Sequence, residues 1–304
     1  MKLLITGIAG FIGSKIAEAA LYEGHQVIGV DDLSQGCLEN VPLNADFIEC
    51  DLSQLNYMKL LPTDIDIILH LAGQSSGEIS FDDPVADLTK NTVSTLNLIR
   101  FGIANRVRKI IYASSMSVYG DVGDKPVNEH QICNPLSCYG VSKLASENYL
   151  RIYQNELPFI IFRMFNVYGP GQSLSNLRQG MVSIYLAHAL KNNCIPIKGS
   201  LERFRDFIYI DDVVNIWMQT VHNSNVNNCT FNLGTGEKTF VRDLLFKIKE
   251  IIPNSSWVEA QNTPGDQFGV HANISLLKET FTTSNFTPFF TGLAQFIDWA
   301  KNRI

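Results

Sequence analysis

Gly7-Ile8-Ala9-Gly10-Phe11-Ile12-Gly13 joins an apolar strand pattern, Lys2–Thr6, to a helical pattern that continues to Glu23. A glycine-rich turn at such a junction lets the backbone approach a pyrophosphate, and the first N–H groups of the helix can bind it. The spacing is GxxGxxG rather than GxGxxG, but its place between a strand and a helix predicts a dinucleotide site. The residues expected to contact the dinucleotide are Gly7, Gly10, Phe11, Ile12 and Gly13.

Acidic residues follow the next two predicted strands. Asp31 ends the second strand pattern, where a carboxylate can accept hydrogen bonds from the ribose hydroxyls of the cofactor. The segment Asp32-Leu33-Ser34-Gln35-Gly36 contains no Arg or Lys that would neutralise a 2′-phosphate, so the sequence favours NAD over NADP. We expect Asp32 to lie at the same site. Asp51 and Leu52 follow the third strand pattern, and they either line the adenine pocket or form a solvated turn.

The first two thirds of the chain alternate short apolar segments with longer helical patterns. Strand patterns cover Lys2–Thr6, Gln26–Val30, Phe47–Cys50, Ile65–Leu71, Lys109–Ser114 and Phe159–Met164. Helical patterns cover Phe11–Glu23, Val85–Asn105, Ser137–Asn155, Met181–Asn192, Val213–Val221, Val241–Ile251 and Leu293–Asn302. This alternation predicts an α/β fold with a doubly wound parallel sheet of the Rossmann type. We expect residues 1–168 to form an NAD-binding domain and residues 169–304 mainly a smaller C-terminal substrate-binding lobe, with the chain crossing between the two.

The composition is that of an ordinary globular protein, and it narrows the choice of partners. The 304 residues include 45% hydrophobic and 18% charged residues, enough to bury a large core. The net charge of −6 argues against a surface for nucleic acid or an anionic membrane, and no apolar run is long enough to span a membrane. The six cysteines form no CxxC pair, which favours a reducing, cytoplasmic location. The six histidines have no HxxxH or HxH spacing, so the sequence predicts no metal site.

Tyr139 and Lys143 share one face of a predicted helix because they are four residues apart. A nearby ammonium and the positive charge of an oxidised nicotinamide favour phenolate, so we expect the pKa of Tyr139 to fall toward neutrality. Upstream, Tyr112-Ala113-Ser114-Ser115-Met116-Ser117-Val118-Tyr119-Gly120 places hydroxyls after an apolar strand, at the sheet edge where open α/β sheets bind ligands. A serine there could hydrogen-bond the same oxygen that the tyrosine deprotonates.

With these residues the whole chain resembles the extended short-chain dehydrogenase/reductase family, in its nucleotide-sugar epimerase and dehydratase branch. The resemblance runs through GxxGxxG, His70-Leu71-Ala72, Asn91, SSMSVYG, YGVSK, Arg163-Met164-Phe165-Asn166-Val167-Tyr168-Gly169-Pro170, Arg205-Asp206-Phe207-Ile208-Tyr209-Ile210-Asp211-Asp212-Val213, Asn232-Leu233-Gly234-Thr235-Gly236 and Pro264-Gly265-Asp266. It implies a catalytic triad of Ser115, Tyr139 and Lys143. It also implies cofactor contacts from Leu71, Ala72, Asn91, Tyr139 and Lys143, diphosphate contacts from Asn166 and Arg205, and a sugar contact from Ser117. Finally, it implies a homodimer packed through the helices Val85–Asn105 and Ser137–Asn155.

Two positions distinguish the branches of this family. Family dehydratases carry an Asp-Glu pair directly after the catalytic hydroxyl residue, and family decarboxylases carry a Glu at the second position, but this chain has Met116 and Ser117 there. One acid/base and one hydride carrier remain, which suffice for epimerisation through a 4-keto intermediate. We therefore expect an NAD-dependent 4-epimerase of UDP-Glc/UDP-Gal, UDP-GlcNAc/UDP-GalNAc or both. The alternatives are an NDP-4-keto-sugar reductase and a non-catalytic dinucleotide-binding regulatory protein.

The substrate side departs from the family pattern at one residue. Family members often have an arginine before the Pro-Gly-Asp motif, where this chain has Thr263. Arg178 is a candidate substitute that would bind the diphosphate, and a surface arginine is the alternative. In the resembling 4-epimerases, the seventh residue beyond that arginine lines the pocket near the C2 substituent of the sugar, which corresponds to Val270. A small valine there predicts that an acetamido group fits, unless Val270 is only a strand residue packed inward.

Overall fold

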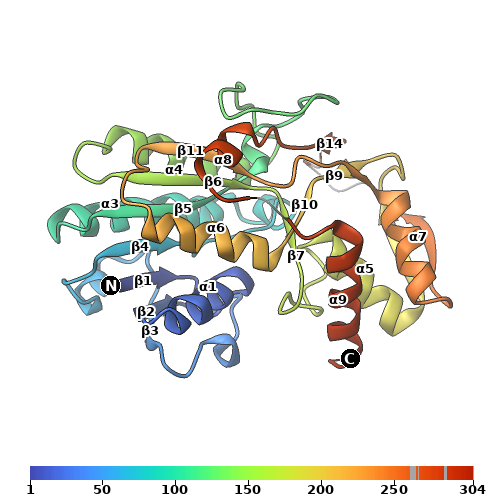
Figure 1. The fold of residues 1–304 in the computed structure, drawn as a ribbon, viewed down its shortest axis with the longest axis horizontal. Coiled ribbons are helices and arrows are strands. Elements are labelled where there is room, and N and C mark those ends of the chain that lie inside the picture. The colour runs from blue at the N-terminus through green and yellow to red at the C-terminus, as the bar shows by residue number, and fades with distance from the viewer. Residues whose placement is uncertain (261–264, 266, 284–285, 304) are drawn as a thin grey trace.

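The computed structural model describes residues 1–260, 265, 267–283 and 286–303 (Figure 1). Seven strands form one parallel sheet in the order β11-β6-β5-β4-β1-β2-β3. These strands are β1 (Lys2–Thr6), β2 (Gln26–Asp31), β3 (Asp46–Glu49), β4 (Ile67–His70), β5 (Lys109–Ser115), β6 (Phe159–Met164) and β11 (Cys229–Leu233). The strand order reverses at β1, and open α/β sheets bind ligands beside such a reversal, at the carboxyl ends of the strands. The predicted doubly wound parallel sheet is confirmed.

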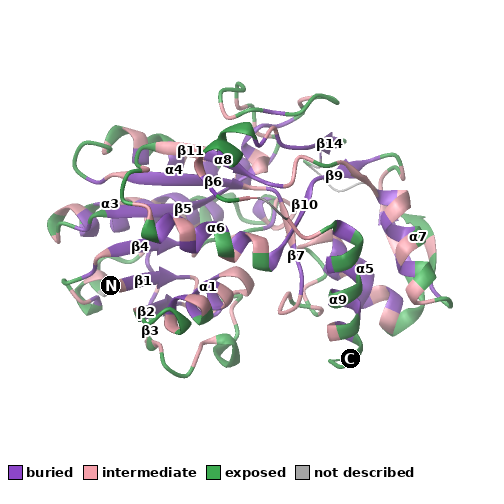
Figure 2. Ribbon diagram, in the orientation of Figure 1, coloured by how far each residue is buried: buried purple, intermediate pink, exposed green. Residues whose placement is uncertain are grey.

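Helices cover both faces of this sheet. α1 (Phe11–Tyr22) and α6 (Ile210–His222) lie on one face, where their apolar side chains share a core with β1, β4, β5 and β6. α3 (Ser94–Ala104) and α4 (Cys138–Ile152) lie on the other face and share a second core with the same sheet. Apart from the edge strand β3, these strands are therefore mostly buried (Figure 2). Their near-continuous apolar sequences follow from this burial, because such strands have no solvent-facing side.

A smaller lobe stands beyond the carboxyl ends of the strands (Figure 1). Its core is formed by helices and short strands from the second half of the chain. The remaining elements outside the large sheet are α5 (Met181–Asn192), α7 (Val241–Ile251), α8 (Ser275–Thr280), α9 (Phe289–Lys301), β7 (Asn166–Tyr168), β8 (Cys194–Lys198), β9 (Phe204–Arg205), β10 (Phe207–Tyr209), β12 (Thr239–Phe240), β13 (Ser256–Ala260) and β14 (Gly269–Val270). β11 pairs with β6, and α6 packs against α1, so segments after residue 168 return to the large sheet. The division at residues 168 and 169 stays a prediction.

The segment predicted as one helix from Val85 to Asn105 is divided. α2 (Pro84–Leu88) and α3 are joined by a π-helical turn, Thr89–Val93. Hydroxyl groups bond to backbone carbonyls here, since Thr95 Oγ1 donates to the carbonyl of Asn91 at 2.6 Å. Such side-chain hydrogen bonds compete with the regular helical pattern. Among the described residues, no helix has the length and apolar character needed to cross a membrane.

Candidate active site

The glycine-rich turn lies at the carboxyl end of β1. Gly7 has a φ of 73°, and a Cβ there would lie 2.7 Å from the backbone nitrogen of Ala72 in the loop after β4. A Cβ on Gly13 would lie 2.1 Å from the carbonyl oxygen of Gly7. Gly10 is the N-cap of α1, and the predicted cofactor residues Phe11 and Ile12 open that helix. The turn therefore exposes backbone N–H groups at a helix N-terminus, the arrangement that binds phosphate.

Asp31, at the end of β2, is tied to this turn. Its Oδ2 accepts a hydrogen bond from the N–H of Ala9 at 3.0 Å, and its Oδ1 accepts one from the N–H of Leu33 at 2.9 Å. Burial raises the pKa of Asp31, and these backbone hydrogen bonds oppose the rise. Each oxygen keeps a second lone pair that could accept a ribose hydroxyl. Leu71 and Ala72 lie beside the turn, since their N–H groups donate to the last residue of β1.

Lys90 is a residue on the cofactor side that sequence reasoning missed. Its Nζ donates a hydrogen bond to Asp32 and lies 3.1 Å from Oδ2 of Asp51, so it links the loops that follow β2 and β3. Burial opposes the charged form, but the hydrogen bonds to the two carboxylates raise the pKa of Lys90. Leu52 is buried beside this link. The available sequence signal was the position of Lys90 next to the motif residue Asn91.

β5 and α4 bring the three expected catalytic residues together. Ser115 is the last residue of β5, while Tyr139 and Lys143 lie near the start of α4, and all three are buried. Ser115 lies close enough to Tyr139 that its hydroxyl acts to lower the pKa of Tyr139. Lys143 Nζ donates to the carbonyl oxygen of Ala113 at 2.9 Å and lies 5.8 Å from the centre of the Tyr139 ring. Ser115 Oγ also donates to Ser117 Oγ at 3.2 Å.

The pKa of Tyr139 does not fall toward neutrality in the protein alone. Burial raises the pKa of Tyr139 to about 12, and the nearby Ser115 hydroxyl only partly opposes this effect. Burial lowers the pKa of Lys143 to about 8, although Asp87 and Glu147 act to raise it. The expected fall included the charge of an oxidised nicotinamide, so it stays a prediction for the enzyme with NAD bound; in the protein alone, desolvation of the phenolate dominates.

Two buried carboxylates that the sequence did not identify connect α4 to its neighbours. Asp87 accepts hydrogen bonds from Ser142 Oγ at 2.6 Å and from Asn91 Nδ2 at 3.2 Å. Glu147 forms a two-point ion pair with Arg163, with N–O distances of 3.0 and 2.7 Å. Asp87 thus joins α2 to α4, and Glu147 joins α4 to β6. The sequence signal for Glu147 was its position one helical turn beyond Lys143, on the same helix face.

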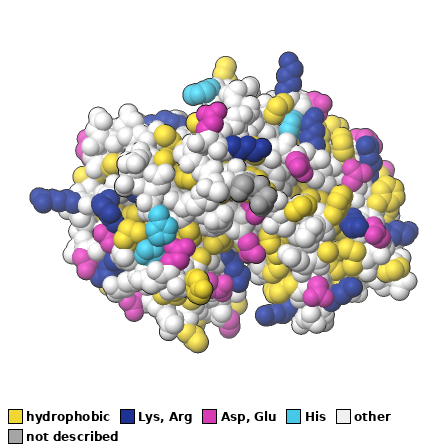
Figure 3. Space-filling model, viewed as in Figure 1, with side chains coloured by type: hydrophobic (Ala, Val, Ile, Leu, Met, Phe, Trp, Pro, Cys, Tyr) yellow, Lys and Arg dark blue, Asp and Glu magenta, His cyan; other side chains and the backbone are white. Residues whose placement is uncertain are grey.

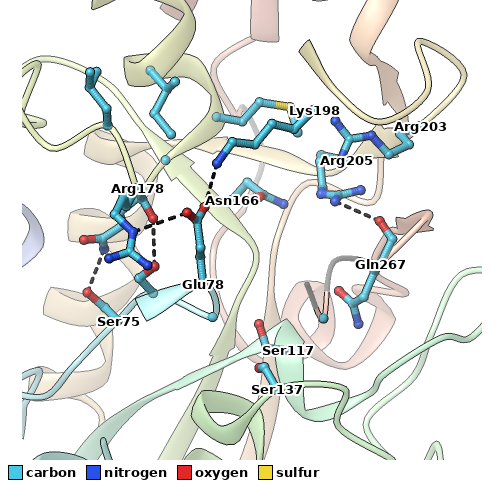
Figure 4. Close-up of a pocket in the computed structure, with 18 of the residues that line it drawn as sticks. Ser75, Glu78, Ser117, Ser137, Asn166, Arg178, Lys198, Arg203, Arg205 and Gln267 are labelled. Carbon is cyan, nitrogen blue, oxygen red and sulfur yellow. Dashed lines mark hydrogen bonds and ion pairs between the residues drawn. The ribbon is translucent and has the colours of Figure 1, made fainter. Parts of the chain in front are cut away.

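A cavity of about 280 Å³ adjoins the catalytic group. It lies between the loop after β4, the start of α4 and the smaller lobe (Figure 4). Its lining residues are Ser75, Ser76, Gly77, Glu78, Met116, Ser117, Leu136, Ser137, Asn166, Leu177, Arg178, Gln179, Gly180, Met181, Ile184, Tyr185, His188, Pro196, Lys198, Arg203, Arg205, Gly265 and Gln267. Met116 and Ser117 directly follow Ser115 in the chain. The cavity therefore begins beside the expected catalytic hydroxyl.

Three of the predicted substrate residues line this cavity with Ser117. Asn166 Nδ2 donates to the carbonyl of Asp206 at 3.3 Å. Arg205 is buried, and its guanidinium donates to the carbonyls of Phe204 and Gln267 at 2.8 and 2.9 Å. These contacts fix the orientation of the Arg205 side chain at the cavity wall (Figure 4).

Arg178, the third of these residues, is ion-paired within the cavity wall. Its Nε lies 3.3 Å from Glu78 Oε1, and its Nη1 lies 2.6 Å from Asp82 Oδ2. Glu78 also binds Lys198 Nζ at 3.0 Å, so one carboxylate holds two cations at the same side of the cavity (Figure 4). Lys198 and Glu78 were not identified from the sequence, because isolated charged residues carry no motif.

The structure does not place Val270 on the wall of this cavity. Its side chain is fully buried, and it belongs to the core between the large sheet and α6. In β14 it pairs with Arg205 of β9, so only its backbone neighbours a substrate residue. This burial fits the interpretation of Val270 as a strand residue packed inward. It does not fit a side chain that contacts the C2 substituent of the sugar. Thr263, from which that position was counted, lies outside the described residues.

The glycine turn, the Ser-Tyr-Lys group and the cavity all lie at one edge of a doubly wound sheet. The model of the NAD dependent epimerase/dehydratase family matches residues 3–234, about three quarters of the chain. The chain belongs to this family.

Several members of the family are similar to this chain over most of its length. The UDP-glucose 4-epimerase of Mycolicibacterium smegmatis is 36% identical over 80% of this chain and 80% of its own length. The crystal structure of the Thermotoga maritima UDP-glucose 4-epimerase with UDP-glucose has a TM-score of 0.94 and 31% identity, covering 100% of this chain and 99% of that one. The Thermus thermophilus UDP-glucose 4-epimerase in complex with NAD has a TM-score of 0.91 and 28% identity, covering 100% of both chains.

The residues of this chain fit the NAD that the family uses. There is no room for a Cβ at Gly7 or Gly13, so the chain at the start of α1 offers only its backbone N–H groups. A pyrophosphate binds to such groups. Asp31 stands at the end of β2, where an adenosine ribose would lie. Lys143, buried between β5 and α4, offers an ammonium within the same edge of the sheet. These positions would hold the two ends of the dinucleotide.

Proposed function

We propose that this protein is an NAD-dependent 4-epimerase of a UDP-activated hexose. The observation that carries the proposal is the buried Ser115-Tyr139-Lys143 group, which adjoins the cavity without an acidic residue at Met116 or Ser117. Dehydration and decarboxylation need a further carboxylate at those positions, whereas epimerisation at C4 does not. The similarity to UDP-glucose 4-epimerases supports the same substrate class.

In the proposed mechanism, Tyr139 takes the proton of the sugar 4-hydroxyl while the hydrogen at C4 leaves as hydride. When bound, NAD would supply a hydride acceptor and donor at this position, which lets the C4 hydrogen be removed and then restored on the other face of the sugar. Ser115 lies beside the Tyr139 hydroxyl, so it can hydrogen-bond the substrate oxygen whose proton is moved. Lys143 keeps a positive charge beside Tyr139, which favours the phenolate needed to accept that proton. Tyr139 then gives the proton back, so no net acid, base or oxidant is consumed.

The smaller lobe would hold the nucleotide part of the substrate. We assign Asn166 and Arg205 to the diphosphate and Ser117 to the sugar, since all three line the cavity beside the catalytic group. Arg178 also faces the cavity, but Glu78 and Asp82 already neutralise it. Its binding of a phosphate would therefore require exchange of these ion pairs.

Incubation of the purified protein with UDP-sugars, without added cofactor, tests the proposal. UDP-Glc, UDP-Gal, UDP-GlcNAc and UDP-GalNAc are supplied one at a time, and the epimers are separated by chromatography. We expect conversion in both directions, and NAD released when the protein is denatured. Consumption of NADPH with an NDP-4-keto-sugar would instead identify a reductase. NAD binding without turnover on any sugar would identify a binding protein.

We also propose that the protein is a cytoplasmic homodimer. Val85 and Leu88 of α2 and Val141 and Ile152 of α4 are exposed apolar residues on the two helices predicted to pair. Light scattering coupled to size-exclusion chromatography should give twice the mass of one chain. A lysine at Val141 should lower the dimer fraction, whereas a lysine at the fully exposed Leu43 should not. A monomeric wild-type protein would contradict the dimer.

A further inference from the structure

Three potential metal ligands from distant parts of the sequence meet at the surface of the large domain. They are Glu23, which follows α1, His25, which precedes β2, and His222, the last residue of α6. His222 Nε2 lies 2.6 Å from Glu23 Oε2, and His25 Nε2 lies 3.7 Å from the same oxygen. The three ligand atoms all lie within 4.8 Å of one another. This is the spacing from which small side-chain rotations bring three ligands to bond distance of one ion.

His25 provides a second, independent observation. Only 8% of its side chain is exposed, and its Nε2 is buried without a hydrogen-bond partner. A buried polar atom without a partner is costly, so a native structure that keeps one invites an explanation.

We propose that Glu23, His25 and His222 form a binding site for a divalent transition-metal ion of the zinc type. Two imidazoles and one carboxylate are ligands that Zn²⁺ accepts, with bond lengths of about 2.0 to 2.2 Å. Three protein ligands leave the fourth tetrahedral position to water. The ligand set lacks thiolate, so it suits Zn²⁺, Co²⁺ or Ni²⁺ rather than a soft ion such as Cu(I).

The position of the site indicates a structural role. His25 lies directly before β2, at the amino ends of the strands, whereas the catalytic group lies at their carboxyl ends. Glu23 and His222 are 199 residues apart in the sequence, yet α1 and α6 pack against each other. On the face drawn in Figure 3, histidines (cyan) and an acidic side chain (magenta) meet where the end of α6 lies in Figure 1. A bound ion would therefore crosslink α6 to the turn between α1 and β2 and stabilise the folded state.

Zinc titration of the NAD-containing enzyme tests this proposal. After treatment with a chelator, the wild-type protein should bind one Zn²⁺ by calorimetry, and zinc should raise its Tm. His222→Ala and Glu23→Gln should each weaken binding at least tenfold and remove the rise in Tm. His130→Ala changes an exposed histidine outside the cluster, so it should bind zinc like the wild type. The metal-free Tm of each variant checks that the fold is retained, since His222 and Glu23 are both partly exposed.

Cobalt titration identifies the ligand atoms. Co²⁺ bound by nitrogen and oxygen lacks the intense thiolate charge-transfer band that a cysteine ligand would give. Its absence in the wild type and the loss of the weaker visible bands in His222→Ala would support the site. Three results would overturn the proposal: no zinc binding by the wild type, equal binding by His222→Ala, or a thiolate band showing that exposed cysteines such as Cys37 or Cys194 hold the ion. Turnover is expected to be unchanged in His222→Ala and in Glu23→Gln. The outcome of the metal titrations therefore does not depend on the proposed epimerase activity.

Discussion

Replacement of Tyr139 by phenylalanine removes the hydroxyl that the proposed mechanism uses and leaves the ring in place. The side chain is buried, and its ring lies 5.8 Å from Lys143 Nζ. The substitution also removes the hydroxyl's interaction with the nearby Ser115. Because burial of a hydroxyl also costs desolvation, the free energy of unfolding should change by no more than about 1 kcal/mol. The fold and the NAD content should therefore be retained.

The effect on turnover follows from the protonation of Tyr139. With its pKa raised to about 12, roughly one molecule in 10⁵ would carry a phenolate at pH 7 in the protein without a cofactor. Tyr139 must then accept the proton as the hydride leaves, which is general base catalysis and contributes about 10² to 10⁴ in rate. Tyr139→Phe should lower kcat by at least about a hundredfold. Ser115→Ala should cost less, because a hydrogen bond is lost but the base remains.

The assay measures interconversion of UDP-glucose and UDP-galactose by the purified variants, together with Tm and NAD content. Tyr149→Phe is the matched control, since it makes the same change on an exposed residue of α4. It should keep the wild-type kcat. A Tyr139→Phe enzyme with near-wild-type kcat would refute the role of Tyr139 as acid and base. A large fall in kcat accompanied by loss of NAD would instead assign the residue to cofactor binding.

Four further experiments test other parts of the same site. Asp87→Asn removes a charge that raises the pKa of Lys143, so this pKa should fall below about 8. In a pH profile, the decrease of kcat at alkaline pH should therefore begin at a lower pH than in the wild type. Calorimetry should find tighter binding of NAD than of NADP, because Asp31 would repel a 2′-phosphate; equal affinities would contradict this. Val270→Tyr overfills the core, so it should lower Tm. The ratio of kcat/KM for acetamido sugars to that for the other sugars should stay unchanged. A selective loss of acetamido activity would instead show that residue 270 limits the size of the C2 substituent. Glu147→Ala leaves a buried arginine unpaired and should cost about 3 to 5 kcal/mol in denaturant unfolding, and a cost below about 1 kcal/mol would refute this estimate of the ion pair.

The fold could be predicted from the sequence because its main determinants are local. β1 and β6 occupy the predicted residues, and α5 and α7 begin and end as expected. The interruption at Thr89–Val93 could not be predicted, because it depends on hydroxyl groups that bond to backbone carbonyls only after the helix has formed. The return of β11 to the large sheet depends on pairing with β6 across the smaller lobe, which no local pattern encodes.

Residues of the site were predictable where a motif fixes the spacing of side chains along one element. Tyr139 and Lys143 meet because an α-helix places residues four apart on one face. Lys90 and Glu78 could not be found in this way, since each binds carboxylates or cations that are distant in the sequence. The role of Val270 was left open by the sequence for a related reason. Its place was counted from Thr263 along the sequence, and such a count does not determine which side chains face a cavity and which face the core.

The charges around Lys143 explain how one tyrosine could both take and return a proton. Burial alone would push Lys143 toward the neutral form, which could not stabilise a phenolate. Asp87 and Glu147 oppose that effect, and the pKa of Lys143 stays near 8, so the ammonium persists at neutral pH. The same burial keeps Tyr139 protonated until a second positive charge is present beside it. NAD bound in its oxidised form would supply such a charge, and the reduced form would not. The phenolate would therefore be favoured before the hydride leaves the sugar, and the protonated tyrosine would be favoured while the 4-keto sugar waits for the hydride to return.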